Sequence, residues 1–305
     1  MAGSTPVYEP PASEPSAGRR SRLRRLVRSP SGAVGAALLV VILATGFGWS
    51  FATPYDPAAQ NLSIPVHPPS LAAVRGGVHL LGTDQLGRDI FSRLVVGLRI
   101  SLVVALAVVP ISMLLGLAIG MVTGYRGGWM DVALMRLVDA QLSIPTLLLA
   151  VAVVAVLGTG LAQIVTVLAI TGWPGYARVV RAEVLSLRER EFAAAARAVG
   201  ASDARILAQH VLPNVLPTML VLGTLHLPVV IIFEAALSFL GLGIQPPTPS
   251  LGQMIAQAQD LVWQAWWMPT IPGVAITLVV LAFNLLGDRL RDVLDPRLRG
   301  LGGPV

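Results

Sequence analysis

The chain has no cysteine and no lysine, and it carries little charge for its length of 305 residues. Without cysteine it can form no disulfide, no thiolate nucleophile and no cysteine-based metal site. Without lysine it lacks the phosphate-binding motif G-x-x-x-x-G-K-[ST], so we expect no cofactor and no ATP bound by this chain. Charged residues make up 12% of the sequence, about half of the ~25% that soluble domains carry. We therefore expect lipid, rather than water, to surround most of its surface.

The chain contains long apolar stretches that suit contact with lipid. Hydrophobic residues make up 54% of the chain, and a helix needs ~20 of them in succession to cross the hydrocarbon core of a bilayer. The sequence therefore predicts an all-α fold, a polytopic membrane helical bundle with six transmembrane helices. The expected spans are 33–52, 100–124, 133–157, 161–181, 214–241 and 270–287. Gly116 and Gly120 form a G-x-x-x-G pair, which permits close helix packing.

The arginines indicate the orientation in the membrane. If the N-terminus is cytoplasmic, 18 of the 22 arginines fall in segments on the inner side. Cytoplasmic loops are enriched in arginine and lysine, so this bias predicts cytoplasmic N- and C-termini for a multi-pass protein of the cell membrane. The arginines are dispersed between apolar spans instead of forming a basic domain, so we expect no nucleic-acid partner.

Composition shifts divide the chain into five parts. The first part is rich in Pro, Ser and Gly, and such composition predicts disorder. Before the second span we expect an amphipathic helix that starts at Thr83 or Asp84 and lies on the outer surface. The parts are 1–29, a disordered basic cytoplasmic tail; 30–52, the first transmembrane helix; 53–99, an extracytoplasmic segment with the amphipathic helix; 100–290, the transmembrane core with a cytoplasmic hairpin at 184–213; and 291–305, a cytoplasmic tail.

The hairpin (184–213) is too polar to cross lipid and too regularly patterned for a loop. Residues 188–199 are strong helix formers, and Gly200 is placed to end that helix. Ser202 or Asp203 can cap a second helix that runs through His210, before Pro213. The alanines at 193–196 leave a shallow surface that suits docking of another protein. The alternative is a solvated hairpin without a partner.

The hairpin resembles the EAA motif of ABC importer permeases. Five residues match that motif in register: Ala195, Ala196, Gly200, Leu212 and Pro213. Ala194 stands where the motif has glutamate and His210 where it has isoleucine, while Glu191 lies one turn before Ala194.

Five further blocks are similar to the C-type permease subunit of dipeptide and oligopeptide ABC importers. They occur in the family's order and together cover about residues 30–300. The blocks are LGTDQLGRDIFSRLVVGLRISL (81–102), DAQLSIPTLLLA (139–150), GYARVVRAEVLSLRE (175–189), ALSFLGLGIQPPTPSLGQMI (236–255) and NLLGDRLRDVLDPRLR (284–299). Leu251 departs from the family, which usually has tryptophan there.

The resemblance implies a non-catalytic subunit with the type I ABC importer permease fold. It also implies four kinds of partner: a homologous second permease in a heterodimer, two ABC ATPase subunits that hold ATP and Mg²⁺, an extracytoplasmic substrate-binding protein, and a peptide substrate. The residues expected to couple this chain to an ATPase are Glu191, Ala195, Ala196, Gly200, Asp203, Arg205, His210 and Pro213.

Polar side chains within the expected spans are candidates for a translocation pathway. These are Asp139, Gln141, Glu234 and Asn284. A carboxylate at the bilayer centre costs ~2.5–3.5 kcal/mol on insertion scales, so each needs water or a polar partner. The alternative is pairing with polar groups of the partner subunit; we favour that for Asp139 and leave Glu234 open. The four histidines show no metal-ligand spacing.

Three other functions compete with a peptide importer subunit. The same architecture could import nickel chelates or glutathione, because nothing in the spans fixes the cargo. A stand-alone secondary transporter commonly shows internal repeats, and none is clear between 33–157 and 161–287. An intramembrane enzyme needs a nucleophile–base pair or a metal motif in its spans, and the sequence shows neither.

Overall fold

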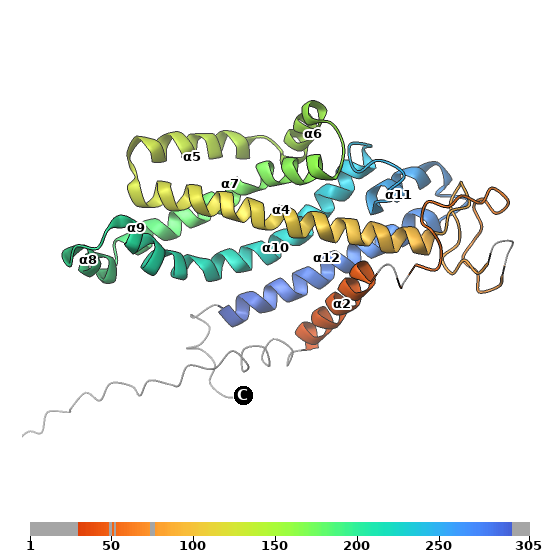
Figure 1. The fold of residues 1–305 in the computed structure, drawn as a ribbon, viewed down its shortest axis with the longest axis horizontal. Helices are drawn as coiled ribbons and strands as arrows, with labels where there is room; N and C mark the ends of the chain where they lie inside the picture. Colours follow the sequence, from red (N-terminus) through yellow and green to blue (C-terminus); the bar gives the residue numbers. More distant parts are fainter. Residues whose placement is uncertain (1–29, 49–50, 52, 74–76, 295–305) are drawn as a thin grey trace, which may run out of the picture.

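The computed structural model describes residues 30–48, 51, 53–73 and 77–294. These residues form helices and connecting loops without a strand, apart from one isolated bridge between Thr83 and Asp89. The helices run mostly along one long axis (Figure 1). The predicted all-α class is confirmed. The expected tail 1–29 and most of the expected tail 291–305 lie outside the described residues.

Seven helices build the bundle in the described part of the chain. They are α2 Pro30–Phe47, α4 Ile90–Arg126, α5 Gly128–Ser143, α6 Thr146–Leu157, α7 Leu161–Arg188, α10 Leu212–Phe239 and α12 Trp267–Leu294. Shorter elements connect them: α8 Glu191–Ala198, α9 Asp203–Ile206 and the π-helical turn η1 Leu207–Val211 at one end, and α11 Leu251–Ala258 with the 3₁₀ turn η2 Gln259–Leu261 at the other (Figure 1).

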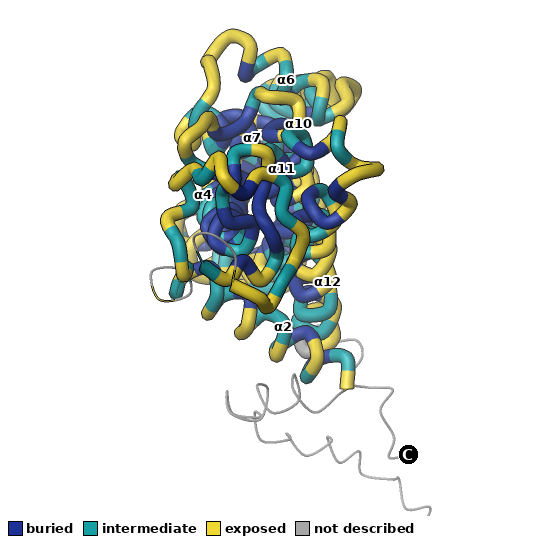
Figure 2. Tube along the Cα trace, turned by 90° about the vertical axis from the view of Figure 1, so that its right-hand side faces the viewer, coloured by how far each residue is buried: buried dark blue, intermediate teal, exposed yellow. Residues whose placement is uncertain are grey.

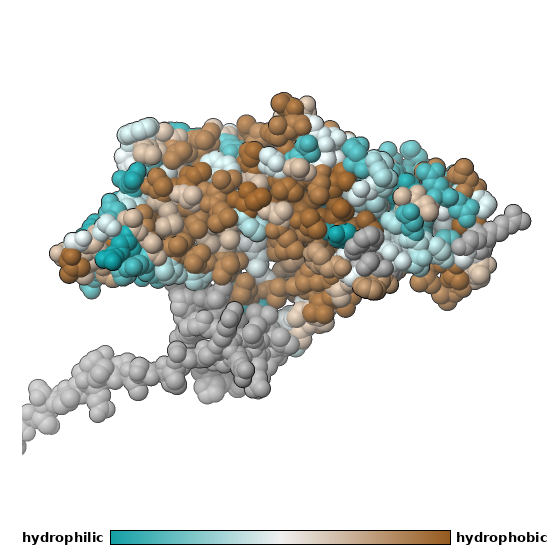
Figure 3. Space-filling model, viewed as in Figure 1, coloured by the Kyte–Doolittle hydropathy of each residue, from teal (hydrophilic) through white to brown (hydrophobic). Residues whose placement is uncertain are grey.

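Four helical stretches are long and apolar enough to cross a membrane, and a fifth counts if the bent pair α5–α6 is one span. Apolar side chains gather over the middle of the bundle, with polar ones at both ends (Figure 3). The predicted span at 161–181 corresponds to α7, which is not among these stretches. The count of six crossings therefore stays a prediction.

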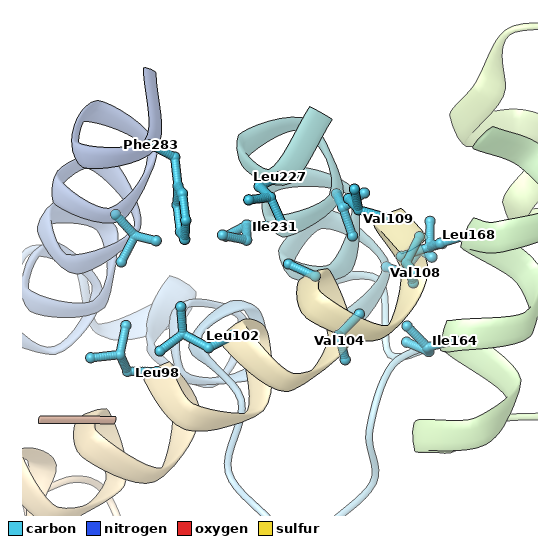
Figure 4. Packing of buried hydrophobic residues seen from close by; sticks show 14 of the residues in the cluster. Leu98, Leu102, Val104, Val108, Val109, Ile164, Leu168, Leu227, Ile231 and Phe283 are labelled. Carbon is cyan, nitrogen blue, oxygen red and sulfur yellow. The ribbon is translucent and has the colours of Figure 1, made fainter. Parts of the chain in front are cut away.

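The core forms around α4, which lies between the other long helices. Leu98 and Leu102 of α4 point toward α10 and α12, where they approach Ile231 and Phe283 (Figure 4). Farther along α4, Val108 faces α7 (Figure 4). Viewed end on, the buried residues lie at the centre of the bundle and exposed ones outside (Figure 2). Because the outer faces are apolar too, helices that face lipid need not be amphipathic.

The most extensive helix contact joins α4 to α7 through a stripe of glycines. Gly116, Gly120 and Gly124 recur every four residues and face α7. A Cβ atom at Gly120 would lie 2.6 Å from the Cβ atom of Val180, closer than side chains tolerate. The G-x-x-x-G pair seen in the sequence therefore sets the separation of these two helices.

The predicted amphipathic helix starting at Thr83 or Asp84 is wrong. Asp84 instead accepts hydrogen bonds from the backbone N–H groups of Leu86 and Arg88, and Gly87 adopts φ +70°. Both features stabilise a turn in place of a helix. The helix begins at Ile90, because Asp89 caps it by accepting the N–H of Ser92 at 2.7 Å. It then continues without a break as α4, so the expected division at residue 99 falls inside one helix.

The continuous third span predicted at 133–157 is also wrong. The chain breaks between α5 and α6, which are bent by 96°. Ile144 has an extended backbone (φ −93°, ψ 129°), as expected for the residue before a proline, because the ring of Pro145 disfavours the helical region there.

Because Gly120 lies closer to its neighbouring helix than Gly223 does, we expect an alanine substitution to destabilise the protein more at Gly120 than at Gly223. Gly120→Ala should force α4 and α7 apart and lower the free energy of unfolding by ~1–3 kcal/mol. Gly223→Ala in α10 is the matched control, because its Cβ atom would meet Val109 at an ordinary 3.5 Å. Thermal unfolding in detergent, followed by tryptophan fluorescence, measures both. Equal melting temperatures for the two variants would contradict the proposed contact.

Candidate functional site

The first helix of the hairpin (184–213) is α8, which stops at a glycine turn. Gly200 adopts φ +81°, a conformation that favours glycine. Its N–H donates to the carbonyl of Arg197, and the N–H of Ala201 donates to the carbonyl of Ala196. These two bonds form a Schellman motif, which satisfies the last carbonyls of the helix. The predicted helix end at Gly200 is confirmed.

Side chains of α8 and α7 fix the angle between the two helices. Arg197 donates to the carbonyl of Arg188, the last residue of α7, and from Nε to the carbonyl of Ala193 at 3.2 Å. Ala193 is fully buried, and the ring of Phe192 lies 5.9 Å from that of His210. The first turns of α8 are thus packed on the bundle, while the rest of α8 extends away from it.

The C-terminal end of α4 supports the hairpin from the opposite side. Arg188 donates from Nη1 to the carbonyls of Gly124 and Tyr125, at 3.1 and 3.4 Å. The hydroxyl group of Tyr125 donates to Asp203 at 2.9 Å. The ends of α4, α7 and the helix that follows the hairpin therefore meet beneath α8, and a displacement of α8 would act on all three.

The second helix of the hairpin begins where the sequence predicted but does not end at His210. Ser202 occupies the N-cap position of α9 without a side-chain cap. The chain then passes through the π turn η1 into α10 as one helical stretch, Asp203–Phe239. Pro213 lies in the first turn of α10, where a missing N–H is tolerated. The N–H of Leu212 reaches back five residues to the carbonyl of Leu207, so the chain passes the proline without ending the helix.

The predicted coupling residues divide into a supported set and an outward set. Ala196 and His210 are partly buried. Exposed residues are Glu191, Ala195, Gly200, Asp203, Arg205 and Pro213. Ala194 and Ala198 are exposed as well, and Val199 is 85% exposed. The outward side of α8 is therefore small and apolar, bordered by charged side chains.

The four polar residues proposed for a pathway do not come together. Asp139 forms an ion pair with Arg178 of α7, and both side chains are about half exposed. Gln141 is half-buried and also contacts α7. Asn284 is exposed on α12, which packs mainly against α10, α2 and α11, whereas α5 packs mainly against α4 and α7.

Glu234 lies inside the bundle. Its side chain is fully buried and accepts hydrogen bonds from the hydroxyl groups of Ser101 at 2.6 Å and Ser238 at 2.8 Å. These partners come from α4 and from α10 itself, and they satisfy the carboxyl group within one chain. A pathway-lining role does not fit this burial.

Sequence reasoning missed the groups that hold the hairpin and α5 in place. Asp131 pairs with Arg181 through two hydrogen bonds, and Tyr125 and Arg188 join the end of α4 to the hairpin. The sequence did contain a signal for these pairs, because charged residues within or beside spans need partners. The acidic residues Asp131 and Asp139 could have been matched with the basic residues Arg178 and Arg181. Across the described part of the chain, no group of three or more acidic or histidine side chains could hold a metal.

The fold has a counterpart among solved structures. A permease chain of the MetNI methionine ABC transporter, solved in inward-facing conformations, matches with a TM-score of 0.54 over 66% of this chain and 96% of that one, at 24% identity. The family described as the binding-protein-dependent transport system inner membrane component matches residues 116–300. This chain belongs to that family.

Curated relatives of this transport-system component match nearly its whole length. The di/tripeptide transport system permease protein DppC of Pseudomonas aeruginosa is 42% identical over 96% of this chain and 98% of its own. The nickel transport system permease protein NikC of Escherichia coli is 43% identical over 86% and 91%. The glutathione transport system permease protein GsiD of Pectobacterium atrosepticum is 40% identical over 90% of each.

The buried position of Glu234 predicts a role in stability. Glu234→Gln should keep the melting temperature and uptake near wild type, because the amide can bond to both serine hydroxyls. Glu234→Ala should lower the free energy of unfolding by ~2–4 kcal/mol, since it leaves a cavity and two hydroxyls without partners. Thermal unfolding and substrate uptake, measured together, check this. Loss of uptake by Glu234→Gln at an unchanged melting temperature would instead assign the residue to the pathway.

Proposed function

We propose that this permease is the C-type subunit of an ATP-driven importer of di- or oligopeptides and forms half of its translocation pathway. The homologous second permease supplies the other half. Two separate ATPase subunits bind ATP and Mg²⁺ and perform the hydrolysis, and an extracytoplasmic substrate-binding protein delivers the peptide. In this scheme the permease itself catalyses no chemical step.

The observation that carries the proposal is the outward side of α8. Its small residues allow another protein surface to approach closely, while Glu191 and Arg205 offer charged contacts around it. The chain has no lysine-containing phosphate loop, so in this scheme the energy of ATP hydrolysis enters from a partner by contact. An ATPase that moves α8 would act on α4, α7 and α10 through Tyr125, Arg188 and Arg197.

The half-exposed ion pair between Asp139 and Arg178 is our evidence for the side of the bundle that borders the passage or the partner permease. Asp139 lies about 16 Å along α5 from its start, and charges at such depth face water or protein rather than lipid. We therefore propose that this side of α5 and α7 borders the pathway or the second subunit. Exposed Asn284 on α12 keeps its proposed pathway role as a separate contact.

We favour peptide cargo because the di/tripeptide permease covers 96% of this chain. The second candidate is a nickel chelate or glutathione, because permeases for those cargoes are nearly as similar. Uptake of labelled dipeptide, labelled glutathione and a nickel chelate, each measured in reconstituted proteoliposomes, separates the cargoes. Uptake of nickel or glutathione without uptake of the dipeptide would replace the peptide assignment.

The glycine turn gives a test of coupling. In the assembled complex, Gly200→Val should reduce uptake and substrate-stimulated ATP hydrolysis. A β-branched residue at φ +81° costs about 1–2 kcal/mol, or a factor of about 5–30 in the native turn. Reconstituted proteoliposomes measure both activities.

Gly158→Val is the matched control for this variant. Gly158 ends α6, has the same φ of +81°, and likewise has no atom within 4 Å of an added Cβ. The control should lose stability to a similar degree but keep the ratio of transport to hydrolysis. Full coupling in Gly200→Val would remove α8 as the coupling element.

Absence of cysteine makes the orientation directly testable. Val199→Cys and Leu71→Cys introduce single thiols at side chains that are each 85% exposed. A membrane-impermeant maleimide should label Leu71→Cys in intact cells and Val199→Cys only in inverted vesicles, because the arginine bias places the hairpin inside. Labelling of Val199→Cys from outside would reverse the orientation and end the coupling proposal.

A further inference from the structure

The helix α7 contains a proline at its centre, and a side chain from α5 replaces the hydrogen bond that this proline removes. Pro174 has no N–H, so the carbonyl of Ile170 loses its partner within the helix. Gln141 donates from Nε2 to that carbonyl at 2.8 Å and lies 3.4 Å from the carbonyl of Thr171. In a bilayer an unsatisfied carbonyl is costly, so Gln141 stabilises the proline site itself.

The same helix α5 is also bound to the other side of Pro174. We call 161–173 the far arm of α7 and 175–188 the hairpin-side arm, because the latter leads into α8. Asp139 pairs with Arg178 and Asp131 with Arg181, both on the hairpin-side arm. Between these ties, Val138 packs against Trp173 and Ala177. The helices α5 and α7 therefore pack together on both sides of Pro174, and α5 supports the proline site.

The chain at Pro174 is suited to bending. Gly172 and Gly175 flank the proline with only Trp173 between, and no atom lies within 4 Å of a Cβ atom added at Gly175. Kinks in long helices occur at such Pro and Gly positions. Because the two ion pairs hold α5 to the hairpin-side arm, bending α7 requires the contacts of α5 with the far arm to shift. These are the Gln141 bond and the packing of Val138 on Trp173.

We propose that Gln141 is a positioning residue that holds the Pro174 hinge of α7 in the conformation seen here, and that it contacts the helix backbone rather than the cargo. Resting on the proposed function, the inference adds a route by which movement of α8 reaches the far half of the bundle. Movement of the hairpin-side arm carries α5 with it and breaks or remakes the Gln141 bond. The neutral bond is the weakest of the three ties, so it is the one that yields.

Removal of the proline should remove the need for Gln141. In Pro174→Ala, the new N–H can donate to the carbonyl of Ile170, so that carbonyl no longer depends on a side chain. Gln141→Leu should therefore lower uptake per ATP hydrolysed by at least about threefold in the native background and by less than about 1.5-fold in the Pro174→Ala background. The KM for cargo should stay unchanged in each. Reconstituted complexes with all partner subunits supply these numbers.

Hydrogen exchange on the solubilised complex tests the hinge without transport. Gln141→Met keeps the side-chain length but cannot donate, and it should speed exchange at 175–178 by about threefold to tenfold. Exchange at 161–167 should not change. Gln163→Leu, at the start of α7, is the control and should alter neither region. This measurement remains decisive if Pro174→Ala fails to assemble.

Three results would overturn the inference. One is an equal loss from Gln141→Leu in both backgrounds; another is a raised KM for cargo, which would make Gln141 a cargo contact; the third is unchanged exchange at 175–178 in Gln141→Met. A wild-type complex that transports no peptide would count against the proposed function alone, because the exchange experiment needs no cargo.

Discussion

Backbone N–H and C=O groups that cross a bilayer must find partners inside the protein, and this requirement governs each irregular point of the bundle. At Pro145 the chain stops one helix and starts another at 96°. At Pro174 the helix continues, and Gln141 binds the carbonyl that the proline leaves free. At Pro213 the π turn η1 brings the chain into α10. The three prolines thus lie at a helix break, inside a continuous helix and in the first turn of a helix, depending on what lies beside them.

The glycine stripe of α4 also determines how the hairpin is held at the end of the bundle. Because Gly116, Gly120 and Gly124 bring α4 close against α7, the ends of the two helices lie near enough for Arg188 to reach the last carbonyls of α4. The same approach places Tyr125 within a hydrogen bond of Asp203. Helix separation in the middle of the bundle therefore determines whether the hairpin is supported at its end.

Much of the architecture could be predicted from the sequence, because span length and glycine position are local properties. The end of α8 at Gly200 and the span at α12 follow from such signals. Errors arose where two local signals compete: Asp84 stabilises a turn instead of capping a helix, and Pro145 breaks an otherwise apolar span. Side-chain partners such as Ser101 for Glu234 lie 133 positions away, and no spacing in one sequence reveals them.

The buried and half-buried polar groups of the bundle fall into two kinds. Deep polar groups such as Glu234 are satisfied within the chain and stabilise one arrangement of helices. Other groups, including Gln141 and the pair Asp139–Arg178, join α5 to α7 on the two sides of Pro174. On the outward side of the hairpin, small and apolar side chains such as Val199 remain uncovered. A force applied there would meet supports that lead to the Pro174 site through the hairpin-side arm, which is the route that we propose for coupling.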